Sequence, residues 1–479
     1  MRSAVAKLLL FVYLSLGEAF LGHSHRQSSF HRRTSSSPSS SESIRNNNKK
    51  HSTVGATTLK EPSAVASTPP TRKTTILNND DEFLKPEPDK RQYRAVRLWN
   101  GLECLLVSSP ESDVEACSVH VKAGHMDDPD DRPGLAHFHE HMLFLGTQKY
   151  PSENEYEAYL SQNGGSSNAY TDMEDTNYYF SITPFQQEQQ QGEGGDANDE
   201  TCEVDDEECN SSALEGALDR LAQFFVAPRF DRNMVDRELR AIDSEYRNSF
   251  TSDAWKNYQL LKASANPEHP FCKFGCGNYE TLTQGGQIVN ATHATSVKSL
   301  PIDDLLGFWN TYYRTYNMKV CVVGRSSLDV LQESMEKTFG QLPHSSGTPR
   351  HGNLLSDQVF QLEHAQYNQV PAFGKDQLGK IRHVIPLIET RCIKVYFATP
   401  PLGDPLLKQS RPFRVLSHLL GHESPGSLHA ELNGQGLLNG LTSGCKCAQS
   451  AMINGCIHLT HVFFSIHRSC NRHFRLFVV

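Results

Sequence analysis

The sequence predicts an α+β fold, with a mixed β-sheet packed against helices. Two observations lead to this class. Short apolar or alternating segments, which favour strands, recur from about residue 93, and segments with apolar residues at helical spacing lie between them. With 479 residues, the chain has room for two or three domains with sizeable cores.

The first 89 residues are expected to precede the folded part. Residues 1–20 have the layout of a signal peptide, because Arg2 and Lys7 are followed by a mostly apolar stretch, Leu8 to Leu16. This stretch is too short to span a membrane comfortably. Residues 21–89 are of low complexity, and their Ser- and Arg-rich start has the composition of a transit peptide. Two interpretations stay open. Either a bipartite address leads through the secretory pathway to an organelle, or a disordered linker follows a signal for secretion.

The domain expected at 90–342 begins with three strands, at 93–98, 102–107 and 116–123. Asn100 and Gly101 supply a hairpin turn between the first two, because Asn-Gly favours the backbone of a two-residue turn. Further strands are expected at 177–182 and 318–323, and helices at 134–146, 213–226, 232–248, 305–313 and 328–339. An acidic segment, 186–211, holds ten Asp and Glu residues and no Lys or Arg, so we expect a solvated loop insertion there.

The C-terminal part is less regular. Residues 343–382 are weakly patterned and are expected to form a linker. A strand at 392–398 and a helix at 413–420 then indicate the start of a second domain, 383–479, which is only partly present.

The composition excludes some classes of function. A formal net charge of -9 and an isoelectric point near 6.2 argue against a nucleic-acid-binding protein, because phosphate recognition needs clustered Lys and Arg. After the N-terminal stretch, no uninterrupted apolar run of about eighteen residues follows, so no stable membrane span is expected.

The strongest chemical signal is the pattern His-x-x-Glu-His, formed by His137, Glu140 and His141. On a helix, the two histidines lie four residues apart on one face, with the glutamate beside them. Zinc favours imidazole ligands, and a catalytic zinc needs three protein ligands and one open position. Glu140 can then take a proton from water as general base, so the pattern predicts a zinc peptidase site of the inverted kind.

Neighbouring residues leave the rest of the site open. His139 points away from the two ligands on a helix and is expected to be structural. A third ligand should come from another element, and the helix at 232–248 offers Glu238 and Glu245, seven residues apart on one face. Both carboxylates could instead form solvated pairs with neighbouring arginines, and spacing alone does not decide between these interpretations.

Several motifs resemble one enzyme family in the same order along the chain. The segment Gly134-Leu-Ala-His-Phe-His-Glu-His-Met-Leu-Phe-Leu-Gly-Thr147 resembles the active-site helix of the insulysin and nardilysin branch of the pitrilysin family of zinc metallopeptidases. The segments Asn168-Ala-Tyr-Thr171 and Arg237-Glu-Leu-Arg-Ala-Ile-Asp-Ser-Glu245 are similar to the same branch, as is Gly421-His-Glu-Ser-Pro-Gly-Ser427.

The resemblance assigns further roles. It implies one Zn²⁺ per chain, with His137, His141 and Glu245 as ligands and Glu238 as a supporting carboxylate. It also implies that the edge strand near Asn168 and Ala169 holds the substrate backbone as an added strand.

The chain also departs from the family pattern. Members of this branch usually carry Cys at the place of His139, and they are about twice as long. The stretch 445–479 shows no resemblance to the family, so the second domain, of the same type as the first, is expected to end in an atypical tail.

Together these features predict a zinc metalloendopeptidase that hydrolyses peptides or unfolded segments. Its expected partners are peptide substrates and a complementary C-terminal half or second chain. Two alternatives stay open: an inactive truncated homologue that serves as a binding or regulatory subunit, and a subunit of the processing-peptidase type.

Overall fold

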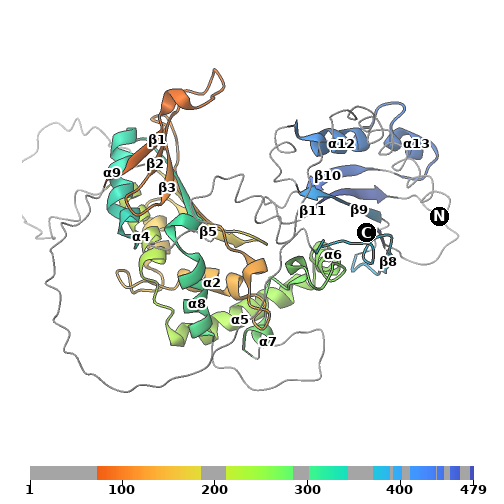
Figure 1. The fold of residues 1–479 in the computed structure, drawn as a ribbon, viewed down its shortest axis with the longest axis horizontal. Coiled ribbons are helices and arrows are strands. Elements are labelled where there is room, and N and C mark those ends of the chain that lie inside the picture. The colour runs from red at the N-terminus through yellow and green to blue at the C-terminus, as the bar shows by residue number, and fades with distance from the viewer. Residues whose placement is uncertain are drawn as a thin grey trace, which may run out of the picture. The chain divides into compact units, whose positions relative to one another are not determined.

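The computed structural model contains two β-sheets, each with helices packed beside it (Figure 1). It describes residues 73–184, 212–283, 301–343, 370–388, 392–401, 410–438, 440–446, 454–463 and 475–478. The expected signal peptide, residues 21–72 of the expected low-complexity region, the whole acidic segment and residues 344–369 of the expected linker lie outside these residues. Among the described helices, none has both the length and the apolarity needed to cross a membrane.

The first sheet has seven strands in the order β1-β2-β3-β7-β4-β6-β5, and only the β3–β7 pair is parallel. Its strands are β1 (Thr75–Asn78), β2 (Gln92–Arg97), β3 (Glu103–Ser108), β4 (Glu115–Val121), β5 (Ser166–Thr171), β6 (Thr176–Ile182) and β7 (Met318–Gly324). The predicted strands are confirmed, and β5 lies at one edge of the sheet.

The turn between β2 and β3 forms at the predicted Asn-Gly pair. Gly101 has a φ of 90°, in the left-handed region that glycine adopts without strain. The buried Asn100 side chain donates hydrogen bonds to the backbone oxygens of Phe339 and Leu342, at 2.9 and 3.2 Å. The turn therefore also anchors the end of the helix that precedes Phe339.

Helices cover one face of this sheet, and Figure 1 shows α4 and α9 beside its strands. The helices of this part are α2 (Leu135–Leu143), α3 (Glu155–Gln162), α4 (Ala213–Val226), α5 (Arg232–Ser249), α6 (Asp253–Lys262), α7 (Tyr279–Thr283), α8 (Ile302–Tyr312) and α9 (Leu328–Thr338). Alternate residues of β4 and β7 are buried against them. The predicted helices are confirmed, and one contiguous core includes Val119, Phe138, Phe224 and Leu239.

Two expected boundaries are corrected by the structure. β1 pairs with β2 although it lies in the region that was expected to be a linker, 21–89; its four residues are mostly exposed and carry no apolar pattern. The expected linker, 343–382, also ends earlier than predicted. Ala372 and Phe373 are buried in a small cluster with Phe271, and β8 begins at Ile381.

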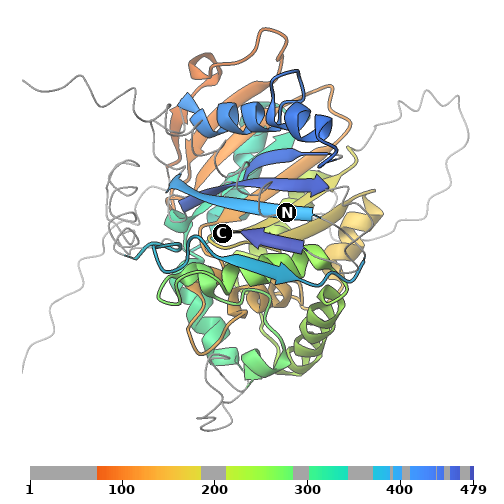
Figure 2. The ribbon, with the colours of Figure 1, turned by 90° about the vertical axis from the view of Figure 1, so that its right-hand side faces the viewer.

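The second sheet has five strands in the order β10-β11-β9-β12-β8. They are β8 (Ile381–Val384), β9 (Cys392–Pro401), β10 (Thr442–Lys446), β11 (Asn454–Phe463) and β12 (Arg475–Val478), accompanied by α12 (Pro412–Gly421) and α13 (Leu428–Gly434). Figure 2 shows α12 running along the blue strands, in agreement with its contacts to β10 and β11. The predicted strand and helix of this part are thus present.

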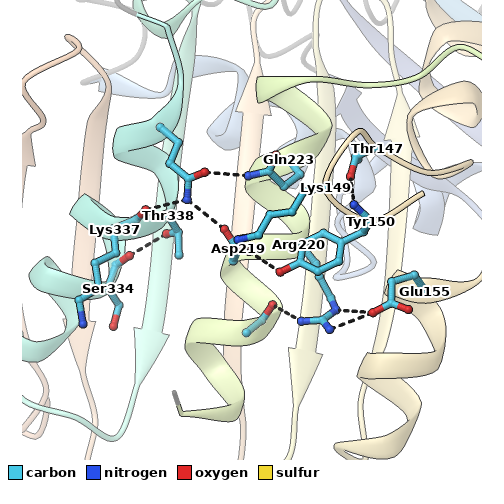
Figure 3. Close-up of polar contacts among 12 residues, drawn as sticks. Thr147, Lys149, Tyr150, Glu155, Asp219, Arg220, Gln223, Ser334, Lys337 and Thr338 are labelled. Atoms are coloured by element: carbon cyan, nitrogen blue, oxygen red, sulfur yellow. Dashed lines mark hydrogen bonds and ion pairs between the residues drawn. The ribbon is translucent and has the colours of Figure 1, made fainter. Parts of the chain in front are cut away.

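A polar cluster ties the loop that follows α2 to α4 (Figure 3). Asp219 of α4 accepts hydrogen bonds from Lys149 Nζ at 2.6 Å, from Gln341 Nε2 at 3.0 Å and from the Tyr150 hydroxyl. Burial raises the pKa of Asp219, but the bonds from Lys149 and Tyr150 outweigh burial and leave the pKa below its usual value. The guanidinium of Arg220 lies 4.5 Å from the Tyr150 ring centroid. These contacts fix the chain directly after α2.

Candidate metal centre

The helix α2 begins at a buried capping carboxylate. Asp128 accepts hydrogen bonds from the backbone nitrogens of Gly134 and Ala136, at 2.7 and 2.8 Å. Its oxygens satisfy N–H groups that have no partner within the helix, and burial raises the pKa of Asp128 to about 8. The first turn of α2, which carries His137, is thereby fixed.

The N-terminus of α2 also packs backbone to backbone against the loop before α7. Gly134 has a φ of 94°, and a Cβ atom there would lie 2.2 Å from the Cα atom of Gly277. Gly277 likewise has a positive φ, of 73°. No residue with a side chain fits at Gly134, so this pair of glycines sets the distance between the loop and the helix.

The structure brings the three proposed ligands together. Nε2 of His137 lies 3.6 Å from Glu245 Oε2, and Nε2 of His141 lies 3.8 Å from the same oxygen. One ligand atom from each of the three residues lies within 4.8 Å of the others. Two ligand atoms of a tetrahedral zinc site are about 3.4 Å apart, given bonds of about 2.1 Å. The two imidazoles and the carboxylate therefore fit a single zinc ion.

Each imidazole has a partner for its other nitrogen. His137 Nδ1 lies 2.7 Å from the backbone oxygen of Cys276, and His141 Nδ1 lies 3.2 Å from Glu238 Oε2. Such outer partners select the tautomer and orient the ring, leaving Nε2 free to bind a metal. Burial lowers the pKa of His141, but the bond with Glu238 and the nearby carboxylates outweigh burial and raise it above its usual value.

Glu140 lies beside this group and has a different partner. It is buried, and its Oε2 accepts a hydrogen bond from the Thr171 hydroxyl at 2.5 Å. Thr171 is the last residue of β5, so the edge strand contacts the proposed base directly. Neither Thr171 nor the Cys276 carbonyl is among the site residues predicted from the sequence. Thr171 does end one of the motifs that resemble the family, whereas a backbone carbonyl has no signature in the sequence.

His139 is fully buried on the opposite side of α2. Its ring lies 4.4 Å from Tyr313 and 5.3 Å from Phe230, measured between centroids, and neither ring nitrogen has a hydrogen-bond partner among the described residues. Burial lowers the pKa of His139 to about 3. The side chain is therefore a neutral part of the core.

Asn168 and Ala169 lie in the middle of β5. In the described part of the chain, β5 pairs only with β6, where Asn168 is opposite Tyr179 and Ala169 is opposite Tyr178. The other edge of β5 thus offers backbone groups that an extended peptide could pair with.

Two family models match the chain. Insulinase (Peptidase family M16) matches residues 103–268, and Peptidase M16 inactive domain matches residues 299–463. The second match extends to residue 463, so it includes residues 445 and 446 at the end of β10 and residues 454–463, which form β11. The expectation that nothing after residue 444 resembles the family is therefore wrong for these residues.

Individual relatives agree with the family models. The chain is 39% identical over 367 residues to insulin-degrading enzyme of Bos taurus and 36% identical over 363 residues to A-factor-processing enzyme of Saccharomyces cerevisiae. Each match covers 76% of this chain and 30% of the relative. The crystal structure of pitrilysin superimposes with a TM-score of 0.63 and 27% identity, over 81% of this chain and 36% of that one. The chain thus spans about 30% of the length of these curated relatives.

Proposed function

Because the chain belongs to the insulinase family of peptidases, we propose that it is a zinc-dependent endopeptidase that hydrolyses peptides or unfolded segments. The observation that carries this proposal is the arrangement around α2. Three ligand atoms converge there within 4.8 Å, and Glu140 lies beside them without joining the group. The second family model is described as inactive, so the activity rests on the residues of α2 and α5.

The side chains divide the chemistry among them. His137, His141 and Glu245 hold the metal, and Glu238 and the Cys276 carbonyl orient the two rings. A zinc ion bound there supplies Lewis acidity and brings the pKa of water toward neutrality. Glu140, positioned by the Thr171 hydroxyl, accepts a proton from the attacking water and passes it to the leaving amine.

In this mechanism the substrate binds along the free edge of β5. An extended peptide that pairs with the free edge near Asn168 and Ala169 gains backbone hydrogen bonds that do not depend on its side chains. Because Thr171 ends the same strand, pairing brings the peptide toward Glu140. Folded proteins are poor substrates in this scheme, since they offer few free extended segments.

Activity has a clear test in the Glu140→Gln variant. We expect this variant to retain zinc and to lose peptide hydrolysis by at least about a hundredfold, because a general base is removed while the ligands stay. Cleavage of unstructured peptides is followed by mass spectrometry, with bound zinc measured on the same samples. Glu333→Gln, which changes an exposed carboxylate on α9, is the control and should cleave like the wild type. Equal cleavage by the Glu140→Gln variant would refute the mechanism.

The same assay separates the alternatives. An inactive binding subunit should bind zinc and peptides but cleave nothing, even when a complementary C-terminal half is supplied in trans. A subunit of the processing-peptidase type should become active only with a second chain. Cleavage by the chain alone supports the proposal that it is an active enzyme that needs no second chain.

We also propose that the first 20 residues direct the chain into the secretory pathway. This proposal rests on the basic start and the apolar stretch of the sequence, which lie outside the described residues. Fusing residues 1–20 or 1–89 to a fluorescent protein distinguishes secretion from delivery to an organelle. Reporter that stays in the cytosol with both fusions would refute the proposal.

A further inference from the structure

The outer side of the metal centre carries a chain of charged contacts. Glu238 points its Oε2 at His141 Nδ1, and its Oε1 lies 3.7 Å from Arg237 Nη2. Arg237 in turn binds both oxygens of Glu153, with Nη1 2.9 Å from Oε2. Glu153 lies in the loop just before α3, so the contacts lead from this loop through α5 to a metal ligand.

We propose that Arg237 is a positioning residue for the metal centre, whose guanidinium, held by Glu153, fixes the Glu238 carboxylate and through it the ring of His141. The inference rests on the metal site of the proposed function and adds two residues to it. A carboxylate that is contacted at both oxygens cannot rotate freely. The imidazole bonded to it then keeps its Nε2 directed at the point shared with His137 and Glu245.

The geometry suits arginine rather than lysine. A guanidinium is a planar fork that binds two carboxylate oxygens at once, and Glu153 occupies it in this way. The same Nη2 that reaches Glu153 also reaches Glu238. An ammonium group could replace the charge but not this fixed planar arrangement.

A purely structural role for Arg237 and Glu153 predicts only a small effect of their loss on stability and none on metal binding. The side chains of Arg237 and Glu153 are 49% and 30% exposed, and ion pairs of this kind contribute at most about 1 kcal/mol to stability. Loss of the pair should therefore leave folding almost unchanged. An effect on metal binding would then have to come from the position of Glu238 and His141.

A purely electrostatic role predicts the opposite sign. Arg237 is a cation near the point where a second cation binds, so removing its charge should strengthen zinc binding. The positioning role predicts weaker binding, because the ligand ring becomes less ordered. The direction of the change in the Arg237→Ala variant therefore separates the two roles.

The experiment measures zinc affinity by competition with a chromophoric chelator, for the full chain and its variants. We expect Arg237→Ala and Glu153→Ala to bind zinc about tenfold more weakly, at the lower end of the range for outer-shell partners. Arg237→Lys should recover part of the loss. The matched control is Arg240→Ala, one turn along the same helix, where the guanidinium pairs only with Asp236 in the described structure, at 3.0 Å, and is 74% exposed. It should bind zinc like the wild type.

A second readout concerns geometry. With Co²⁺ in place of zinc, the visible absorption spectrum reports the arrangement of the ligands. It should change in Arg237→Ala and Glu153→Ala but not in Arg240→Ala, while the melting temperatures of the metal-free proteins stay alike.

The possible outcomes separate this inference from the proposed function. Unchanged or tighter zinc binding by Arg237→Ala, beside a wild type that binds zinc, overturns the positioning role alone. A wild type that binds no zinc overturns both. If Arg237→Ala does not fold, Arg237→Gln carries the same test, because it also removes the positive charge and the planar fork.

Discussion

The two helices that meet at the proposed metal centre hold the proposed ligands in different ways. Seven of the nine residues of α2 are buried, against three of the eighteen residues of α5. The side chains of His137 and His141 are 15% and 26% exposed, whereas that of Glu245 is 56% exposed. Both imidazoles are bonded at Nδ1, and the described contacts of the Glu245 carboxylate are with the two histidines.

This difference separates the parts of the site that exist before a metal binds from the part that a metal completes. The histidines are pre-positioned by the core and by their outer partners. The Glu245 carboxylate keeps much of the freedom of an exposed side chain, which it loses on binding. Changes that displace the part of α2 carrying the two histidines should therefore affect both stability and metal binding, and changes at Glu245 should affect metal binding alone.

The largest effect is expected from Glu245→Gln. Zinc affinity should fall by at least about a hundredfold, or about 2.7 kcal/mol, because a direct ligand is weakened rather than an outer partner. The unfolding free energy of the metal-free protein should change by less than about 0.5 kcal/mol, as is usual for an exposed position. Chelator competition and denaturant unfolding measure the two quantities. Unchanged zinc binding would exclude Glu245 as a ligand and return Glu238 to consideration.

A change at the start of α2 should affect both quantities. Gly134→Ala should lower the unfolding free energy by about 2 kcal/mol or more, because its Cβ meets the Cα atom of Gly277 and its φ is unfavourable. Zinc binding should weaken as well, since the displaced loop carries the carbonyl that orients His137. Gly307→Ala on α8 is the matched control. No atom lies within 4 Å of its added Cβ, so it should stabilise the helix slightly. Equal stability of Gly134→Ala and the wild type would show that the two backbones can separate freely.

A smaller effect, of the opposite sign, is expected at His139. His139→Leu should raise the unfolding free energy by about 1 kcal/mol, because a buried ring with two unpaired nitrogens is replaced by an apolar side chain. Zinc content should not change, since the residue points away from the ligands. Thermal or denaturant unfolding of the metal-free protein measures the gain. A loss of stability would indicate that the ring packs better than its unpaired nitrogens suggest.

The smallest effect on stability is expected from a deletion in the acidic segment, which lies between α2 and α5 in the sequence. Deleting residues 187–210 from the acidic segment should shift the melting temperature by less than about 2 °C, because loop length has only a weak effect on stability and the segment contains few apolar residues. Zinc affinity should also stay the same. A large loss of stability would mean that α2 and α5 depend on the segment that separates them in the chain.

The sequence predicts those elements whose side chains carry a strong pattern. The strands β4 and β7 alternate buried and at least partly exposed positions, and α2 carries the spaced histidines, so all three elements could be predicted. The helix α3 buries only Tyr156 and Leu160, and this is too little for a periodic signal. Glu245 could be placed only through resemblance, because spacing along α5 does not show which carboxylate faces His137. The contacts of Cys276 and Thr171 arise from tertiary packing, which no local pattern encodes.

The strand β5 also sets the distance between Glu140 and each residue of a peptide that pairs with its free edge. Thr171, whose hydroxyl reaches Glu140, is the last of its six residues. A peptide paired along this edge advances about 3.3 Å with each residue, so its distance from the base can be counted in peptide bonds. In the proposed enzyme, the register of pairing with β5 therefore determines which peptide bond is cleaved, because it sets how far the paired segment extends toward Glu140. Because antiparallel ladders repeat every two residues, a slip of the pairing would move the cut by two residues at a time.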